Sequence, residues 1–88
     1  MTHKTRGIVL RSIKYGETSL VIIIFTELFG IQTYIVNGAR SAKKTGNKYL
    51  MYQPAAILDL EVYHQDQKNM QRIKEASWSV LLQQVHSD

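Results

Sequence analysis

The sequence predicts a small all-β domain built from five short strands. Short runs of β-branched and other apolar residues recur along the chain, and Gly, Asn, Asp or Pro separate them. The length of 88 residues suits a single domain, and 44% hydrophobic with 20% charged residues is an ordinary globular composition. A chain this short buries roughly 60% of the surface that its unfolded form exposes, so we expect modest stability.

The first three strands are expected at residues 2–14, 20–26 and 31–36. The first has no cleanly polar face, which either a twisted strand in a small barrel or a β-bulge at Gly7 would explain. The second is apolar on both faces, so one face must point into the core and the other needs cover. Gly30, between the second and third strands, suits the positive φ of a hairpin turn.

Two further strands are expected at residues 55–63 and 70–75. Residues 38–48 lack an apolar period and should form a loop, followed by one helical turn at 49–53 that Pro54 ends. In the fourth strand, alternate residues are uniformly apolar and should face the core. These residues are Ala56, Leu58, Leu60 and Val62. Residues 76–86 have helical apolar spacing, so strand and helix both remain open there.

Five strands with a loop between the third and fourth are typical of the OB fold, a small Greek-key barrel that binds nucleic acid on strands two and three. An SH3-like barrel is the second interpretation. The OB domain should span residues 1–77. Residues 78–88 should begin a linker or a helical domain absent from this chain, because Trp78 and the apolar residues after it would be a costly exposed patch on a free monomer.

Positive charge gathers in the first half of the chain. The net charge is +4, but residues 1–50 hold eight Lys or Arg against two acids, and residues 51–88 hold three against five. Between Glu27 and Asp59 there is no acidic residue. The basic residues in this interval are Arg40, Lys43, Lys44 and Lys48. Unopposed cations on a loop predict phosphate binding, whereas a merely solvated loop usually mixes both signs.

Three more residues are candidates for a nucleic-acid site. Arg11 and Lys14 would extend the positive path from the loop, and Tyr34 on the third strand would stack a base. For Phe25 and Trp78 we expect a place in the core or in an interface.

Nothing in the sequence predicts an enzyme. The three histidines are scattered, cysteine is absent, and the glycine spacing of a phosphate-binding loop is missing, so we expect no catalytic residue, cofactor or metal. No apolar run approaches the roughly 18 residues of a membrane span, and the N-terminus does not resemble a signal peptide. We therefore expect a cytoplasmic protein with no membrane partner.

Short motifs in a fixed order give the chain a family resemblance. They are Thr5-Arg6-Gly7-Ile8-Val9-Leu10-Arg11, Lys14-Tyr15-Gly16-Glu17, Ile24-Phe25-Thr26-Glu27 with Gly30, Asn37-Gly38-Ala39-Arg40, and Gln53-Pro54. Together they resemble the N-terminal part of the bacterial DNA repair protein RecO family. The resemblance runs from Thr5 to about Glu75.

This resemblance implies an OB fold that binds single- and double-stranded DNA without sequence specificity. It also implies support of strand annealing and recombinase loading, with RecR and single-stranded DNA-binding protein as partners. Arg40 matches a basic position of the family, whereas Lys43 and Lys44 fall in its variable loop. The alternative function is a protein-interaction module that docks RecR or the rest of the chain.

Overall fold

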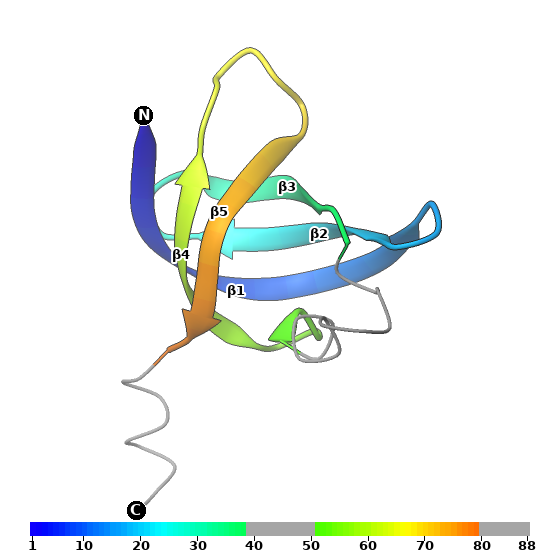
Figure 1. Cartoon of the computed structure of the whole chain (residues 1–88). Coiled ribbons are helices and arrows are strands. Elements are labelled where there is room, and N and C mark those ends of the chain that lie inside the picture. Colours follow the sequence, from blue (N-terminus) through cyan, green and yellow to red (C-terminus); the bar gives the residue numbers. More distant parts are fainter. Residues whose placement is uncertain (39–50, 80–88) are drawn as a thin grey trace, which may run out of the picture.

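The computed structural model describes residues 1–38 and 51–79, which form a closed β-barrel (Figure 1). The strands are β1 (Thr2–Tyr15), β2 (Ser19–Thr26), β3 (Gly30–Val36), β4 (Ile57–Tyr63) and β5 (Gln71–Trp78). Their order around the barrel is β1-β2-β3-β5-β4, and β3 with β5 is the parallel pair. The predicted all-β, five-stranded OB-fold barrel is confirmed.

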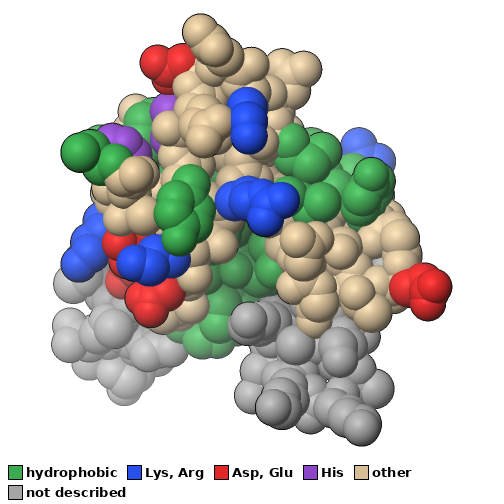
Figure 2. Space-filling view, turned by 45° about the horizontal axis from the view of Figure 1, so that its top comes forward, with side chains coloured by type: hydrophobic (Ala, Val, Ile, Leu, Met, Phe, Trp, Pro, Cys, Tyr) green, Lys and Arg blue, Asp and Glu red, His purple; other side chains and the backbone are tan. Residues whose placement is uncertain are grey.

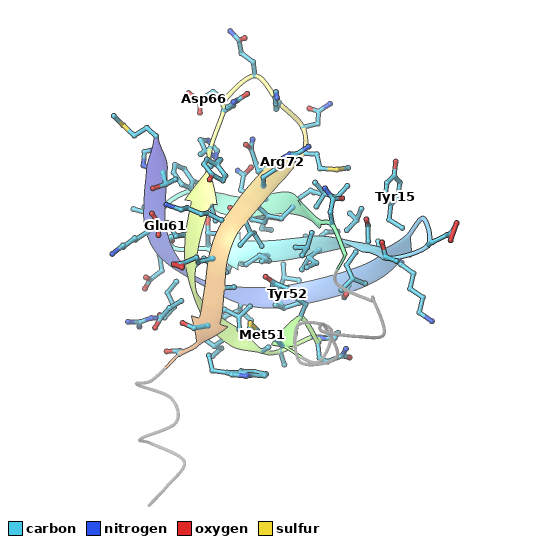
Figure 3. The ribbon with its side chains drawn as sticks, viewed as in Figure 1. Tyr15, Met51, Tyr52, Glu61, Asp66 and Arg72 are labelled. Carbon is cyan, nitrogen blue, oxygen red and sulfur yellow. The ribbon has the colours of Figure 1, made fainter. Side chains whose placement is uncertain are left out.

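The core is filled by alternate residues of the strands. Leu20, Ile22 and Ile24 of β2 have no exposed surface, because each points into the barrel. The predicted core face of β4 is confirmed as well. Its members Leu58, Leu60 and Val62 are buried, and Ala56 packs partly buried against them. Tyr52, from the segment that precedes β4, lies inside the barrel near its lower end (Figure 3).

The β-bulge in β1 lies at Leu10, so the prediction of a bulge at Gly7 is wrong. The register between β1 and β2 shifts between Val9 and Arg11. Val9 is therefore buried, while Leu10 and Arg11 are both exposed. This extra residue explains why neither face of β1 is uniformly polar in sequence.

Gly7 marks a close approach of two strands. It is buried, and a Cβ built on it would lie 2.5 Å from Cγ2 of the buried Ile24. The backbone of β1 can pass β2 at this point only because residue 7 has no side chain. Gly30, with φ of 69°, has the positive φ predicted for the hairpin turn.

The barrel closes between β3 and β5 through a short seam, where Tyr34 pairs with Gln71 and Ile35 with Arg72. The buried Gln71 amide also organises the β4–β5 loop. It accepts a hydrogen bond from the Gln65 backbone and donates to the carbonyls of Gln65 and Lys68.

Several predictions concern residues that the structure does not describe. Apart from Gly38, the loop predicted at 38–48 lies outside the described residues. The first two residues of the helical turn predicted at 49–53 lie outside them as well. β5 extends to Trp78, beyond the predicted end at residue 75. The division of the chain after residue 77 stays a prediction.

Within residues 1–38 and 51–79, no helix has the length and apolar character to cross a membrane.

Replacing Gly7 with Ala should destabilise the barrel by about 1–3 kcal/mol, because the added methyl overlaps the buried Ile24 side chain. Urea unfolding followed by circular dichroism measures this change. Lys4→Ala, at an exposed position of the same strand, is the control and should stay within about 0.5 kcal/mol of the wild type. Equal stability of Gly7→Ala and wild type would show that the strands can separate there without cost.

Candidate nucleic-acid interface

The outside of the barrel has two faces of different chemistry, and the first is a mixed-charge face. It is formed by outward residues of β1, β4 and β5, with Lys4 opposite Glu61 and Arg6 opposite Asp59. Arg6 Nε lies 3.6 Å from Asp59 Oδ1, and Lys74 Nζ lies 3.9 Å from Glu61 Oε2. Figure 2 shows basic and acidic side chains interleaved at its lower left. Because Lys4, Arg6 and Lys74 each have an acidic neighbour, this face is poorly suited to a polyanion.

Glu61 is held in its charged form on this face. Thr2 Oγ1 donates a hydrogen bond of 2.6 Å to Glu61 Oε2, and this bond is the main cause that lowers the pKa of Glu61. The positive charges of Lys74 and Lys4 lower the pKa further. The carboxylate therefore stays ionised and compensates the nearby lysines.

The second face is apolar and lies across the first three strands. We call it the outer β1–β3 face, and it consists of the outward residues Ile8, Leu10, Arg11, Ile13, Tyr15, Ser19, Val21, Ile23, Phe25, Ile31, Thr33 and Ile35. Cross-strand pairing places Ile8, Phe25 and Ile31 in one row. Phe25 is 53% exposed and Ile31 65% exposed. No residue of β1, β2 or β3 is Asp or Glu.

The predicted basic residues are only partly placed by the structure. Arg40, Lys43, Lys44 and Lys48 lie outside the described residues. Arg11 pairs with Ile23 and is exposed in the middle of the outer β1–β3 face. Lys14 pairs with the buried Leu20 and so lies on the other side of β1. Arg11 and Lys14 therefore lie on opposite sides of β1, and their predicted role in extending the positive path from the loop stays a prediction.

The predicted stacking role of Tyr34 is wrong for the described conformation. Tyr34 lies opposite the buried Ile22, so its side chain points into the barrel and has no exposed surface. Burial raises the pKa of Tyr34 to about 12, and its hydroxyl has no hydrogen-bond partner among residues 1–38 and 51–79. A base cannot reach this ring.

Three exposed residues are better placed than Tyr34 for contact with a ligand. Phe25, which we expected in the core or an interface, is exposed on the outer β1–β3 face. Tyr15 projects from the end of β1 beside the β1–β2 turn (Figure 3). Arg72 pairs with Ile35, so it borders this face from β5. Sequence periodicity could not find Phe25, because β2 is apolar at every position except its two ends.

The histidines in the described part of the chain, His3 and His64, both pack against Phe29. His64 stacks on Phe29 with ring centroids 3.8 Å apart, and His3 meets Phe29 edge-on at 5.3 Å. Asp66 lies 2.9 Å from His64 Nε2. This cluster joins β1, the β2–β3 turn and the β4–β5 loop. Among residues 1–38 and 51–79, no three His, Cys, Asp or Glu side chains are grouped so that they could hold a metal ion.

Comparison with known proteins agrees with the family resemblance that the sequence motifs indicate. A family model described as "Recombination protein O N terminal" matches residues 1–81. The chain belongs to the RecO family. DNA repair protein RecO of Flavobacterium johnsoniae is 35% identical over 88 residues, which is all of this chain and 37% of the relative. RecO of Bacteroides fragilis is 40% identical over 76 residues, covering 86% of this chain and 31% of the relative.

The predicted family resemblance is thus confirmed, while the match covers a limited part of the relatives. RecO of Chlorobaculum parvum is 36% identical over 78 residues, which is 29% of its length. The chain therefore spans between 29% and 37% of the length of these RecO proteins, and it matches the N-terminal part of the family.

Replacing Thr2 with Val should raise the pKa of Glu61 toward its ordinary value of 4.5, because the hydrogen bond to the carboxylate is lost. A depressed pKa stabilises the folded state above pH 4.5, and this contribution is lost as pH falls through the folded-state pKa. Wild-type stability should therefore fall more steeply than that of the variant in this acid range. NMR titration of the Glu61 side chain and urea unfolding at several pH values measure both effects.

Thr18→Val, in the exposed β1–β2 turn, is the control for this substitution. This substitution also removes a threonine hydroxyl, but one that does not bond to Glu61. An unchanged pKa in Thr2→Val would mean that the lysine charges, and not the hydrogen bond, hold the carboxylate ionised.

Proposed function

We propose that this RecO domain binds single- and double-stranded DNA without sequence specificity, and that it thereby supports strand annealing and recombinase loading during recombinational repair. The observation that carries the proposal is the continuous absence of acids from residue 28 to residue 58, an interval that contains β3 and four basic residues. The names of the relatives as DNA repair proteins support the same conclusion.

The charge arrangement suits contact with the DNA backbone. Lysine and arginine contacts to phosphates position a nucleic acid but carry no sequence information. The four basic residues Arg40, Lys43, Lys44 and Lys48 follow β3 directly in the chain, and Arg11 adds an exposed cation on a neighbouring strand. Four phosphate contacts to a single strand would give a salt slope of about 3. Such a role needs neither a cofactor nor a catalytic residue, and we propose a non-enzymatic domain.

Replacing Arg40, Lys43 and Lys44 together with Ala should weaken binding to a single-stranded oligonucleotide and lower the salt slope by roughly 2, at about 0.7 for each lost contact. Fluorescence anisotropy of a labelled oligonucleotide at several salt concentrations gives both quantities. The control is Lys4→Ala with Lys74→Ala, which removes cations from the mixed-charge face and should change affinity less for each charge removed. Unchanged affinity and slope in the triple variant would refute this site.

We also propose RecR and single-stranded DNA-binding protein as partners of the complete protein, acting in the bacterial cytoplasm. Support comes from the family to which the chain belongs and from apolar surface at the end of β5. Trp78 is 43% exposed there, and tryptophan is common among residues that dominate protein interfaces. The alternative role of the domain, docking RecR or the rest of the chain, would use such a surface.

Trp78→Ala in the full-length protein should weaken its complex with RecR about tenfold or more, because a large anchoring side chain is lost. Light scattering of the mixed proteins measures complex formation, and Trp78→Phe should retain most of it. Equal binding by wild type and Trp78→Ala would exclude this residue from the RecR interface.

A further inference from the structure

β2 is apolar on both of its faces, and the barrel buries one of them. Its inward residues fill the core, whereas Phe25 is 53% exposed on the outer β1–β3 face. Phe25 lies in one row with Ile8 and Ile31 of the neighbouring strands, and all three side chains are exposed. A strand that is apolar on both faces usually has both faces covered. The apolar row formed by Ile8, Phe25 and Ile31 is therefore a candidate docking surface.

The outer β1–β3 face has the kind of side chains with which one β-sheet packs against another. β-branched side chains pack well on a pleated surface. Two sheets pack face to face with their strand directions about 30° apart. Seven of the twelve residues of this face are β-branched, namely Ile8, Ile13, Val21, Ile23, Ile31, Thr33 and Ile35. The same face of a second copy would offer a sheet of matching character.

Two charged residues flank the apolar row on opposite sides. Arg11 pairs with Ile23, two residues from Phe25 toward the β1–β2 turn. Glu27 lies two residues from Phe25 in the other direction and is exposed in the β2–β3 turn. Its backbone N–H donates a 2.9 Å hydrogen bond to the carbonyl of Arg6, which holds Glu27 beside β1. At roughly 3.3 Å for each strand residue, Arg11 and Glu27 each lie about 7 Å from the row.

A two-fold axis along the apolar row makes this face complementary to itself. In a two-fold dimer every contact occurs twice, because a residue of one copy meets a second residue of the other copy and the reverse also holds. An axis that lies along the row, in the plane of the interface, stacks the row on its own copy and exchanges its two sides. Arg11 of each copy then faces Glu27 of the other.

Both charges are available for such a contact. Within residues 1–38 and 51–79, neither Arg11 nor Glu27 forms an ion pair. Arg6, which lies beside Glu27, already has Asp59 Oδ1 3.6 Å from its Nε. The carboxylate that remains for an incoming Arg11 is therefore that of Glu27. A polyanion on this face would meet Arg11 but would also be repelled by Glu27, whereas a second copy matches both charges and the apolar row.

We propose that the domain forms a symmetric dimer through the outer β1–β3 face, in which Phe25 packs on Phe25 of the second copy and Arg11 pairs with Glu27 of the second copy. The dimer goes beyond the proposed DNA binding and does not rest on it, since it uses none of the basic residues at 40–48. A standard interface has roughly 20–30 residues on each side, and this face has twelve. The dimer is therefore weak, with a dissociation constant in the micromolar range or above.

Sedimentation equilibrium of the 88-residue chain without nucleic acid tests the proposal. The mass should rise from that of one chain toward that of two as the concentration increases from micromolar to millimolar. Phe25→Ala should weaken the dimer about tenfold or more, because Phe25 meets its own copy at the centre of the interface. The control is Tyr63→Ala, which removes a side chain of 40% exposure from β4, outside this face, and should dimerise as wild type does.

A reciprocal charge exchange tests the two-fold arrangement itself. Arg11→Glu and Glu27→Arg each place like charges at both symmetry-related contacts, and each should weaken the dimer about tenfold or more. The double variant restores opposite charges and should recover most of the wild-type affinity. Lys68→Glu, in the exposed β4–β5 loop, changes the net charge as Arg11→Glu does and should leave the dimer unchanged. Thermal unfolding of every variant checks that the barrel is intact.

Each contrary result overturns the proposal in a different way. A chain that stays monomeric at every concentration would exclude a second copy as the cover of this face. Loss of oligonucleotide binding in Phe25→Ala would then assign the face to nucleic acid, and loss of RecR binding by this variant of the full-length protein would assign it to that partner. If Phe25→Ala weakens the dimer but the double charge variant stays monomeric, the two copies meet in another orientation and the two-fold arrangement is wrong.

Discussion

Barrel closure depends on β1, which must pair with two different strands along its length. Its first half pairs with β4 and its second half with β2, and at Gly7 and Ile8 it pairs with both. At this crossing the backbone comes so close to Ile24 that residue 7 has no room for a side chain. The bulge at Leu10 then bends β1 so that it follows β2 to the hairpin turn. The absence of a side chain at Gly7 and the extra residue at Leu10 together allow β1 to close the sheet into a barrel.

Because β1 pairs with β4 along one half and with β2 along the other, its outward residues contribute to two faces of different chemistry. Where β1 pairs with β4, outward residues form cation–carboxylate neighbours such as Arg6 and Asp59. Where β1 pairs with β2, most outward residues are apolar, and Arg11 is the charged residue among them. The barrel thus has one outer surface of paired charges and another on which large apolar side chains are exposed. Membership of the RecO family gives this division a functional context in DNA repair.

The sequence was sufficient to predict the strands, their approximate limits and the core face of β4, because Leu58, Leu60 and Val62 alternate with polar residues. It was not sufficient for β2, whose two faces are both apolar, so alternation could not show that Phe25 points outward. Tyr34 was misplaced for a related reason, since its orientation follows from pairing with Ile22 and not from its own neighbours in sequence. Arg11 and Lys14 lie on opposite faces of β1 because they are three residues apart in a regular stretch of strand, and the bulge at Leu10 precedes both.

The short seam between β3 and β5 has a consequence for how the barrel moves. β1 and β2 pair from Gly7 to Tyr15, whereas β3 and β5 meet at Tyr34–Gln71 and Ile35–Arg72. Local opening costs least where few backbone bonds and little packing must be broken. Breathing of the domain is therefore expected to start at this seam, with β5 hinging away on β4 while the β1–β2 ribbon keeps its shape. Backbone amides beside Gln71 should accordingly be among the early ones to exchange with solvent.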